Sequence, residues 1–207
     1  MLISNNGLNI KAGETFSIWG GAGGLGVFAI QLAKLSGANV IAIVSFDEKK
    51  VFCENLGADA IFNRKVDFPS DFINEIGEPN YIAWNKVKKI INRRGLGEID
   101  YIFEHIGRQT LGLSTYLLKR VGKIVICAAT SGYLAMIDLR FLWMQLKSIV
   151  GSHFANYHED KQASKLIINK KISPIIYKFS SIDDLPELMD DMYLGKTHGK
   201  IVFNYDH

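Results

Sequence analysis

The feature that most constrains the fold of this chain is a glycine-rich turn near its start. Five of the seven residues at positions 20–26 are glycine. A short apolar run at 15–19 precedes the turn and predicts a buried strand. Apolar residues at helical spacing over 24–35 predict an amphipathic helix, and a second apolar run at 40–44 predicts another strand. Strand, turn, helix and strand within about thirty residues make a βαβ unit, so we expect a parallel sheet.

The turn also carries the spacing of a dinucleotide-binding motif. Gly21, Gly23 and Gly26 fit the pattern G-x-G-x-x-G, in which the glycines permit a tight turn, approach of a pyrophosphate and close helix–strand packing. The free N–H groups near Gly24 and Leu25, at the start of the helix, would face the anion. The alternative is an ordinary glycine-rich connection, but the position between strand and helix favours dinucleotide binding.

The end of the second strand indicates which dinucleotide is bound. An NAD site often has Asp or Glu there, whereas this chain has Ser45, followed one helical turn later by Lys49 and Lys50. A third short strand, at 60–63, ends on Arg64. These hydroxyl and cationic groups suit a 2′-phosphate, so we predict NADPH as the cofactor. In the alternative interpretation, Lys49 and Lys50 belong to a solvated helix face.

Strands and helices keep alternating along the rest of the chain. Alternation of this kind predicts an α/β fold: a doubly wound, mostly parallel Rossmann sheet of about six strands with helices on both faces. We expect residues 1–207 to form one dinucleotide-binding domain whose ligands lie beyond the carboxyl ends of the strands. Further strands are predicted at 99–105, 122–129, 148–154, 174–179 and 199–204, and further helices near 84–93, 139–147, 159–169 and 183–193.

One long stretch, 65–84, interrupts this alternation. It contains two prolines and the aromatic residues Phe68, Phe72, Tyr81 and Trp84. Loops of this length are usually functional or disordered. The aromatic residues lead us to expect that this insert packs onto the rest of the domain.

Composition excludes several classes of protein. The net charge is only +3 and no long basic run occurs, so nucleic acid is not an expected partner. Cys53 and Cys127 are far apart and no C-x-x-C occurs, so neither a disulfide framework nor a metal site is expected. No apolar run approaches about 18 residues, and the first residues lack the apolar core of a signal peptide. We therefore expect no membrane association and a cytoplasmic location.

Several longer motifs resemble one enzyme family. The stretches IWGGAGGLG, FEHIGRQTLG, CAATSGY and RFLWMQLKSIVGSHFANY, together with the insert at 65–84, resemble the crotonyl-CoA carboxylase/reductase group of the medium-chain dehydrogenase/reductase superfamily. The resemblance runs from about residue 13 to about residue 202. It implies NADPH-dependent reduction of a 2-enoyl-CoA thioester, with CO₂ capture in the carboxylating members. Members carry a GroES-like substrate domain before the glycine turn, so this chain is expected to be the nucleotide-binding domain alone and inactive by itself.

The resemblance also assigns roles to residues at the strand ends. It implies that His153 helps to hold CO₂ as a catalytic residue and that Arg140 lies near the CoA tail. Backbone or side chains around the nicotinamide are expected from Glu104, His105, Gly107, Ala129, Thr130 and Ser131. The alternatives are a salt-bridged Glu104, a His153 satisfied by backbone groups, and an Arg140 that is only a surface cation on a helix.

Two other functions and one assembly follow from the same residues. The chain could instead be the domain of a non-carboxylating enoyl or quinone reductase, or a stand-alone nucleotide-binding module. The strand at 148–154 is the last before the chain turns back, so we expect it at a sheet edge. Because it carries no proline, and no charge before its histidine, we predict a two-fold homodimer that pairs through this strand.

Overall fold

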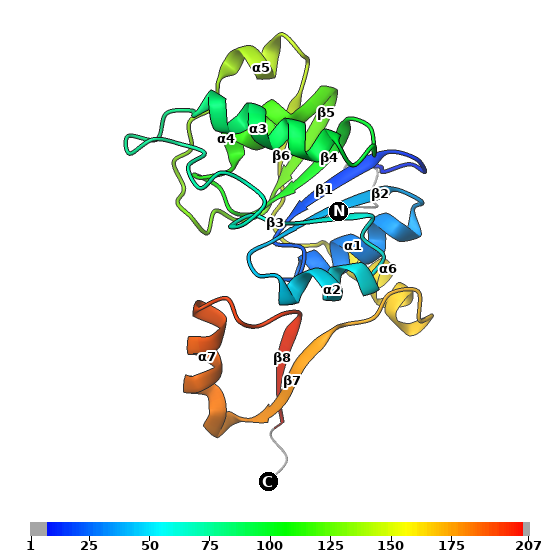
Figure 1. The fold of residues 1–207 in the computed structure, drawn as a ribbon. Helices are drawn as coiled ribbons and strands as arrows, with labels where there is room; N and C mark the ends of the chain where they lie inside the picture. The colour runs from blue at the N-terminus through cyan, green and yellow to red at the C-terminus, as the bar shows by residue number, and fades with distance from the viewer. Residues whose placement is uncertain (1–7, 205–207) are drawn as a thin grey trace.

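A single parallel sheet forms the centre of the molecule. The computed structural model describes residues 8–204, and Figure 1 shows the sheet with helices on both sides. The strand order is β3-β2-β1-β4-β5-β6, with every neighbouring pair parallel. The predicted six-stranded, doubly wound sheet is therefore confirmed. The strands are β1 (Thr15–Trp19), β2 (Asn39–Val44), β3 (Ala60–Asn63), β4 (Ile99–Glu104), β5 (Leu118–Ile126) and β6 (Ser148–Gly151).

The two faces of the sheet bury two separate apolar clusters. Alternation along each strand sends Phe16 and Ile18 to the face covered by α1 and α2, whereas Ile41 and Ile43 face α3 and α4. Figure 1 shows these helix pairs on opposite sides of the sheet. The helices are α1 (Gly26–Leu35), α2 (Glu48–Asn55), α3 (Tyr81–Asn92), α4 (Leu111–Leu117), α5 (Leu139–Trp143), α6 (Tyr157–Ile168) and α7 (Leu185–Tyr193).

Several element boundaries differ from the prediction for local reasons. Helix α3 begins at Tyr81, three residues earlier than expected, because the Asn80 side chain accepts a hydrogen bond from the Ala83 N–H and caps the helix. Helix α5 ends at Trp143, and Leu146, inside the predicted helix, adopts a left-handed φ of 53°. Strand β6 stops at residue 151 and β5 begins at residue 118. These shifts leave the order of the elements unchanged.

The insert at 65–84 is part of the core. Phe68 and Phe72 are buried, and their rings lie 5.3 Å from Phe62 and 6.1 Å from Trp19, respectively. The indole N–H of Trp84 donates a hydrogen bond of 2.7 Å to the backbone oxygen of Phe72. The expectation that the aromatic residues of the insert pack onto the domain is therefore confirmed.

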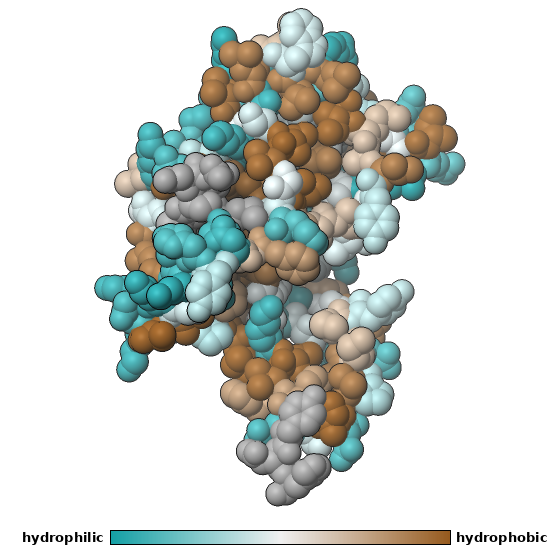
Figure 2. Space-filling model, turned by 180° about the vertical axis from the view of Figure 1, so that it is seen from behind, coloured by the Kyte–Doolittle hydropathy of each residue, from teal (hydrophilic) through white to brown (hydrophobic). Residues whose placement is uncertain are grey.

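The C-terminal strands form a second, smaller unit. Strands β7 (Ile176–Ser181) and β8 (Lys200–Asn204) pair only with each other, and a short 3₁₀ helix (Ile182–Asp184) and α7 connect them. Figure 1 shows this unit beside the helices α1 and α2 rather than in the main sheet. Figure 2 shows that apolar residues cover much of its surface. Its exposed apolar side chains are Phe179, Ile182, Leu185, Met189, Met192, Tyr193 and Leu194.

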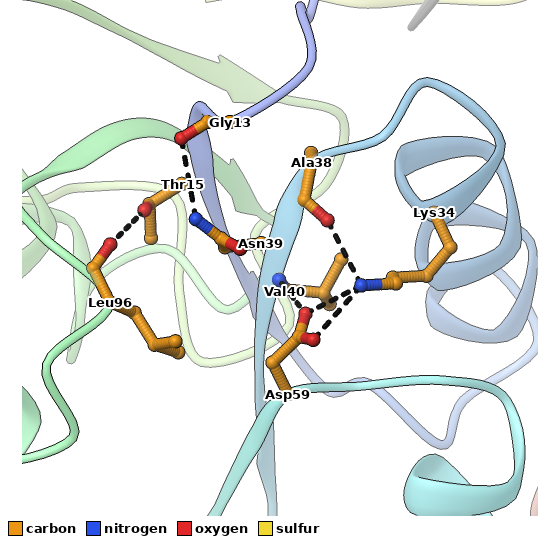
Figure 3. A network of polar contacts seen from close by, with 8 residues as sticks. All are labelled: Gly13, Thr15, Lys34, Ala38, Asn39, Val40, Asp59 and Leu96. Atoms are coloured by element: carbon orange, nitrogen blue, oxygen red, sulfur yellow. Dashed lines mark hydrogen bonds and ion pairs between the residues drawn. The ribbon is translucent and has the colours of Figure 1, made fainter.

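A polar network fastens the amino ends of the first strands (Figure 3). The carboxylate of Asp59 accepts from the buried Val40 N–H at 2.7 Å and from the Lys34 ammonium at 2.8 Å. The Asn39 amide donates to the Gly13 backbone oxygen at 3.3 Å, and the Thr15 hydroxyl donates to a backbone oxygen of the loop before β4. This network lies at the opposite end of the strands from the glycine turn, so it supports the scaffold rather than a ligand.

Candidate functional site

The glycine turn lies at the carboxyl edge of the sheet and is fastened to both neighbouring strands. The Gly21 N–H donates to the Ile43 backbone oxygen of β2 at 3.0 Å. On the other side, His105 Nε2 lies 2.8 Å from the Trp19 backbone oxygen, at hydrogen-bonding distance. Since β1 stands between β2 and β4, these contacts hold the turn at the point where the sheet changes direction. Ligands of doubly wound sheets bind at this point.

The turn has the structure that a pyrophosphate requires. A β-carbon on Gly26 would lie 2.3 Å from the Gly20 backbone oxygen, so only glycine permits this close packing. Among residues 8–204, no acceptor is found for the N–H groups of Gly24 and Leu25, and the first turn of α1 contains no acidic residue. Two free amides at the positive end of a helix form a site for an anion.

Glu104 organises the loop after β4 from beneath. Its carboxylate is fully buried. One oxygen accepts from the N–H groups of Ile106 (2.8 Å) and Gly107 (3.3 Å) and from the Thr110 hydroxyl (2.9 Å), while the other accepts from the Ser114 hydroxyl at 2.7 Å. Burial raises the pKa of Glu104, and the four donors act in the opposite direction. The side chain faces these donors, not a salt bridge, and fixes the backbone at 104–107.

The loops after β4 and β5 lie against each other, as the resemblance implies. The Thr130 N–H donates to the His105 backbone oxygen at 3.1 Å, and the Ser131 N–H donates to the Ile106 backbone oxygen at 2.7 Å. A β-carbon on Gly107 would lie 2.8 Å from the Ala129 side chain. The structure thus brings together the residues proposed to surround a nicotinamide.

The residues proposed for a 2′-phosphate gather at the ends of β2 and β3. The Lys49 ammonium lies 5.6 Å from the centre of the Phe46 ring, beside Ser45, and donates to the Gly195 backbone oxygen at 2.5 Å. Burial lowers the pKa of Lys49. Because an ammonium has three donors, one bond to Gly195 leaves two for a ligand. Lys49 therefore remains available, although the sequence gave no sign of its contact with Gly195.

Lys65 is a residue of this region that the sequence analysis missed. Its ammonium lies 4.0 Å from the centre of the Phe46 ring, and no carboxylate within 8–204 pairs with it. The neighbouring Lys50 is different, because it pairs with Asp47 and Asp67 at 3.0 Å each. The available signal was the basic pair that directly follows a short strand.

Arg64 connects β3 with the loop after β4. Its guanidinium donates to the Gln109 side-chain oxygen at 3.3 Å. This contact places Arg64 at the carboxyl edge of the sheet, between the region of Phe46 and the loop that Glu104 organises. Arg64, unlike Lys50, has no carboxylate partner at ion-pair distance among the described residues.

His153 and Arg140 lie apart from these groups. His153 follows β6, is exposed, and contacts the Phe154 ring at a centroid distance of 4.0 Å. Arg140 belongs to α5 and pairs with Asp138 at 2.7 Å. The Arg140 guanidinium and the Tyr81 hydroxyl, which donates to the same carboxylate at 2.5 Å, hold the pKa of Asp138 well below its usual range. The structure therefore gives Arg140 a partner within its own chain.

An open depression of about 590 Å³ lies beside the loops after β4 and β5. Ile76 and Gly77 of the insert form one wall, and Arg108 and the segment 133–136 complete it. The guanidinium of Arg108 has no ion-pair partner among residues 8–204. This depression gives the insert a place next to the site, which sequence reasoning did not foresee.

Two further searches were confined to residues 8–204. No helix there is long and apolar enough to cross a membrane. No group of three or more His, Cys, Asp or Glu side chains is arranged there to hold a metal ion. We therefore assign no chemistry of this domain to a metal.

The doubly wound sheet, its glycine turn and the free amides at α1 define a Rossmann-type dinucleotide-binding domain. The chain belongs to the zinc-binding dehydrogenase family, whose model matches residues 24–169. The resemblance to the crotonyl-CoA carboxylase/reductase group is confirmed by the relatives that follow.

The chain is similar to enzymes of about twice its length. It is 40% identical to a crotonyl-CoA reductase of Streptomyces avermitilis, covering 97% of this chain and 45% of the relative. It is 35% identical to the crotonyl-CoA carboxylase/reductase of Cereibacter sphaeroides, covering 93% and 46%. A solved structure of the 2-octenoyl-CoA carboxylase reductase CinF from Streptomyces, in complex with NADP and 2-octenoyl-CoA, superposes with a TM-score of 0.88 at 33% identity, covering 98% and 46%.

Proposed function

We propose that this chain is the NADPH-binding half of a 2-enoyl-CoA reductase that belongs with the crotonyl-CoA carboxylase/reductases. The observation that carries the proposal is the glycine turn with its two free amides, fastened to the ends of β2 and β4. The similarity to CinF, solved with NADP, supports the choice of cofactor. When bound, NADPH supplies a hydride for the β-carbon of the enoyl thioester.

The residues of this chain would position the cofactor rather than react. The amides of Gly24 and Leu25 would bind the pyrophosphate. The loops at 104–107 and 129–131, held by the buried Glu104, would form the wall against which the nicotinamide ring lies. Ser45, Lys49, Arg64 and the newly found Lys65 would surround the 2′-phosphate.

The substrate would be completed by parts of the enzyme beyond this chain. An enolate formed by hydride addition takes either CO₂ or a proton, and we propose that His153 helps to hold CO₂. A neutral imidazole can donate one hydrogen bond to an oxygen of CO₂, and the His153 ring is exposed at the end of β6. We retain Arg140 as a candidate contact for the CoA tail, because its guanidinium is largely exposed even with Asp138 bound.

We further propose a two-fold dimer through β6 and a cytoplasmic setting. Strand β6 lies at the edge of the sheet, and its Ile149 and Val150 side chains are half-buried. A short apolar edge without proline favours pairing with a second copy. The two free thiols, Cys53 and Cys127, are compatible with a reducing compartment.

Calorimetry on this chain tests the cofactor assignment. NADPH should bind more tightly than NADH, and Lys49→Ala or Lys65→Ala should weaken NADPH alone, by about tenfold or more for a lost charge-assisted contact. Lys50→Ala is the matched control, because Lys50 is already neutralised by two aspartates. Equal affinities of the unchanged chain for NADPH and NADH would refute the assignment.

A further inference from the structure

Lys200, at the opposite end of the sequence, lies at the start of α1. It is the first residue of β8. A β-carbon built on Gly24 would be 2.9 Å from the Lys200 ammonium nitrogen, so the ammonium contacts the glycine turn itself. Gly24, Thr197 and Lys200 line a common cavity of about 340 Å³ between α7, β8 and the turn.

The backbone that carries Lys200 is fixed on the turn. The Gly199 N–H donates to the Ala22 backbone oxygen at 2.9 Å, and the Lys200 N–H donates to the Ile175 backbone oxygen at 2.8 Å. Gly199 has a φ of +58°, and a β-carbon on it would lie 2.3 Å from the Ile175 oxygen, so only glycine fits. The His198 ring contacts Phe52 of α2 at a centroid distance of 4.4 Å. These contacts determine where the Lys200 side chain begins.

The charge of Lys200 is uncompensated in this position. Among residues 8–204 its ammonium has neither an ion-pair partner nor a side-chain hydrogen bond. The turn at 20–26 and the first turn of α1 contain no acid. A cation at the positive end of a helix dipole is unfavourable on its own. An anion bound between the ammonium and the free amides of Gly24 and Leu25 would make all three groups favourable.

We propose that Lys200 binds the diphosphate of the cofactor, together with the amides of the glycine turn. This inference rests on the proposed function, and it adds a positioning residue that neither the glycine motif nor the 2′-phosphate residues contain. Because NADPH and NADH share the diphosphate, Lys200 would strengthen both to the same extent. Lys49 and Lys65, by contrast, would strengthen NADPH alone.

Calorimetry with three ligands tests Lys200. Lys200→Ala should weaken NADPH and NADH by the same factor, about tenfold for one charge-assisted contact. It should leave adenosine 2′-monophosphate, which lacks the diphosphate, unchanged. Lys200→Arg should restore most of the affinity and Lys200→Gln should not. Lys196→Ala is the matched control on the same segment, because Lys196 already pairs with Asp191 at 2.9 Å and should change no affinity.

The outcomes separate this inference from the proposed function. If the unchanged chain binds neither dinucleotide, the proposed function fails. If it binds both and Lys200→Ala changes neither affinity, Lys200 does not contact the diphosphate and only this inference is overturned. A loss confined to NADPH would also overturn it, because it would assign Lys200 to the 2′-phosphate. Circular dichroism of each variant verifies that the fold is retained.

Discussion

Replacing the buried carboxylate of Glu104 should reveal how the loop at the site is held. We compare Glu104→Leu, which has a similar volume but no acceptor, with Glu104→Gln, which keeps one acceptor oxygen and loses the charge. The wild-type carboxylate accepts four hydrogen bonds from two backbone N–H groups and two hydroxyls. The two variants therefore separate the loss of acceptors from the loss of charge.

The magnitude follows from the groups left without partners. The hydroxyls of Thr110 and Ser114 can rotate toward other acceptors, but the amides of Ile106 and Gly107 are fixed by the backbone. Each buried donor without a partner costs about 1–3 kcal/mol, so Glu104→Leu should lower the free energy of unfolding by about 2–6 kcal/mol. Glu104→Gln can still accept from both amides and removes a buried charge, so it should cost less than about 2 kcal/mol.

Urea denaturation followed by tryptophan fluorescence measures both effects, because Trp19 and Trp84 are fully buried. Trp19 is also a close reporter, since its indole N–H donates to Ser114 at 2.8 Å. The reasoning is refuted if Glu104→Leu unfolds within about 1 kcal/mol of the wild type, which is less than the cost of one unpaired amide. It is refuted equally if Glu104→Gln is as unstable as Glu104→Leu, because the charge and not the acceptors would then hold the loop.

The remaining predictions concern a buried lysine, the sheet edge and the histidine after β6. Burial lowers the pKa of Lys147 to about 8, below the 10.5 of a free lysine, so the unfolded chain gains a proton first and stability falls as the pH falls from 10.5 to 8. Lys147→Met should remove this dependence, worth up to about 3 kcal/mol, in urea denaturation at pH 7.5 and 10; a pH-independent difference between the two proteins would contradict it. Val150→Pro removes a backbone donor of β6 and should yield monomers in light scattering, whereas a monomeric wild type at high concentration would disprove pairing through β6. In an enzyme that contains this chain, His153→Asn should lower the ratio of carboxylated to reduced product; an unchanged ratio with slower turnover would restrict His153 to ordering the nicotinamide pocket.

The parts of the site that lie close together in the sequence could be predicted, because local patterns determine them. The glycine spacing at 20–26 constrains a single strand–helix connection, and the structure places Gly26 against the Gly20 oxygen as expected. Apolar alternation likewise predicted all six strands of the main sheet. Their ends shifted where one side chain or one φ angle decided the boundary, as at Asn80 and Leu146.

The parts that join distant segments could not be predicted. Lys49 meets Gly195, and Lys200 meets Gly24, across separations that no sequence period reports. The inward orientation of Glu104 depends on hydroxyls of α4, which only the folded chain brings beneath β4. Strands β7 and β8 show the same apolar alternation as the others, so the pattern could not indicate that they would leave the main sheet.

The central position of β1 has a consequence for the order in which the chain can fold. Its partner β2 follows directly, whereas its other neighbour, β4, supplies Asp100 to the Thr15 N–H across 85 positions. At ribosomal rates of about 5–20 residues per second, the stretch from the end of β3 to β4 takes about 2–8 s to synthesise. For that time a three-stranded half-sheet can form with the β4-facing edge of β1 unpaired. We expect this nascent half-sheet, and not the finished domain, to be the state of this chain that aggregates most readily and depends most on chaperones.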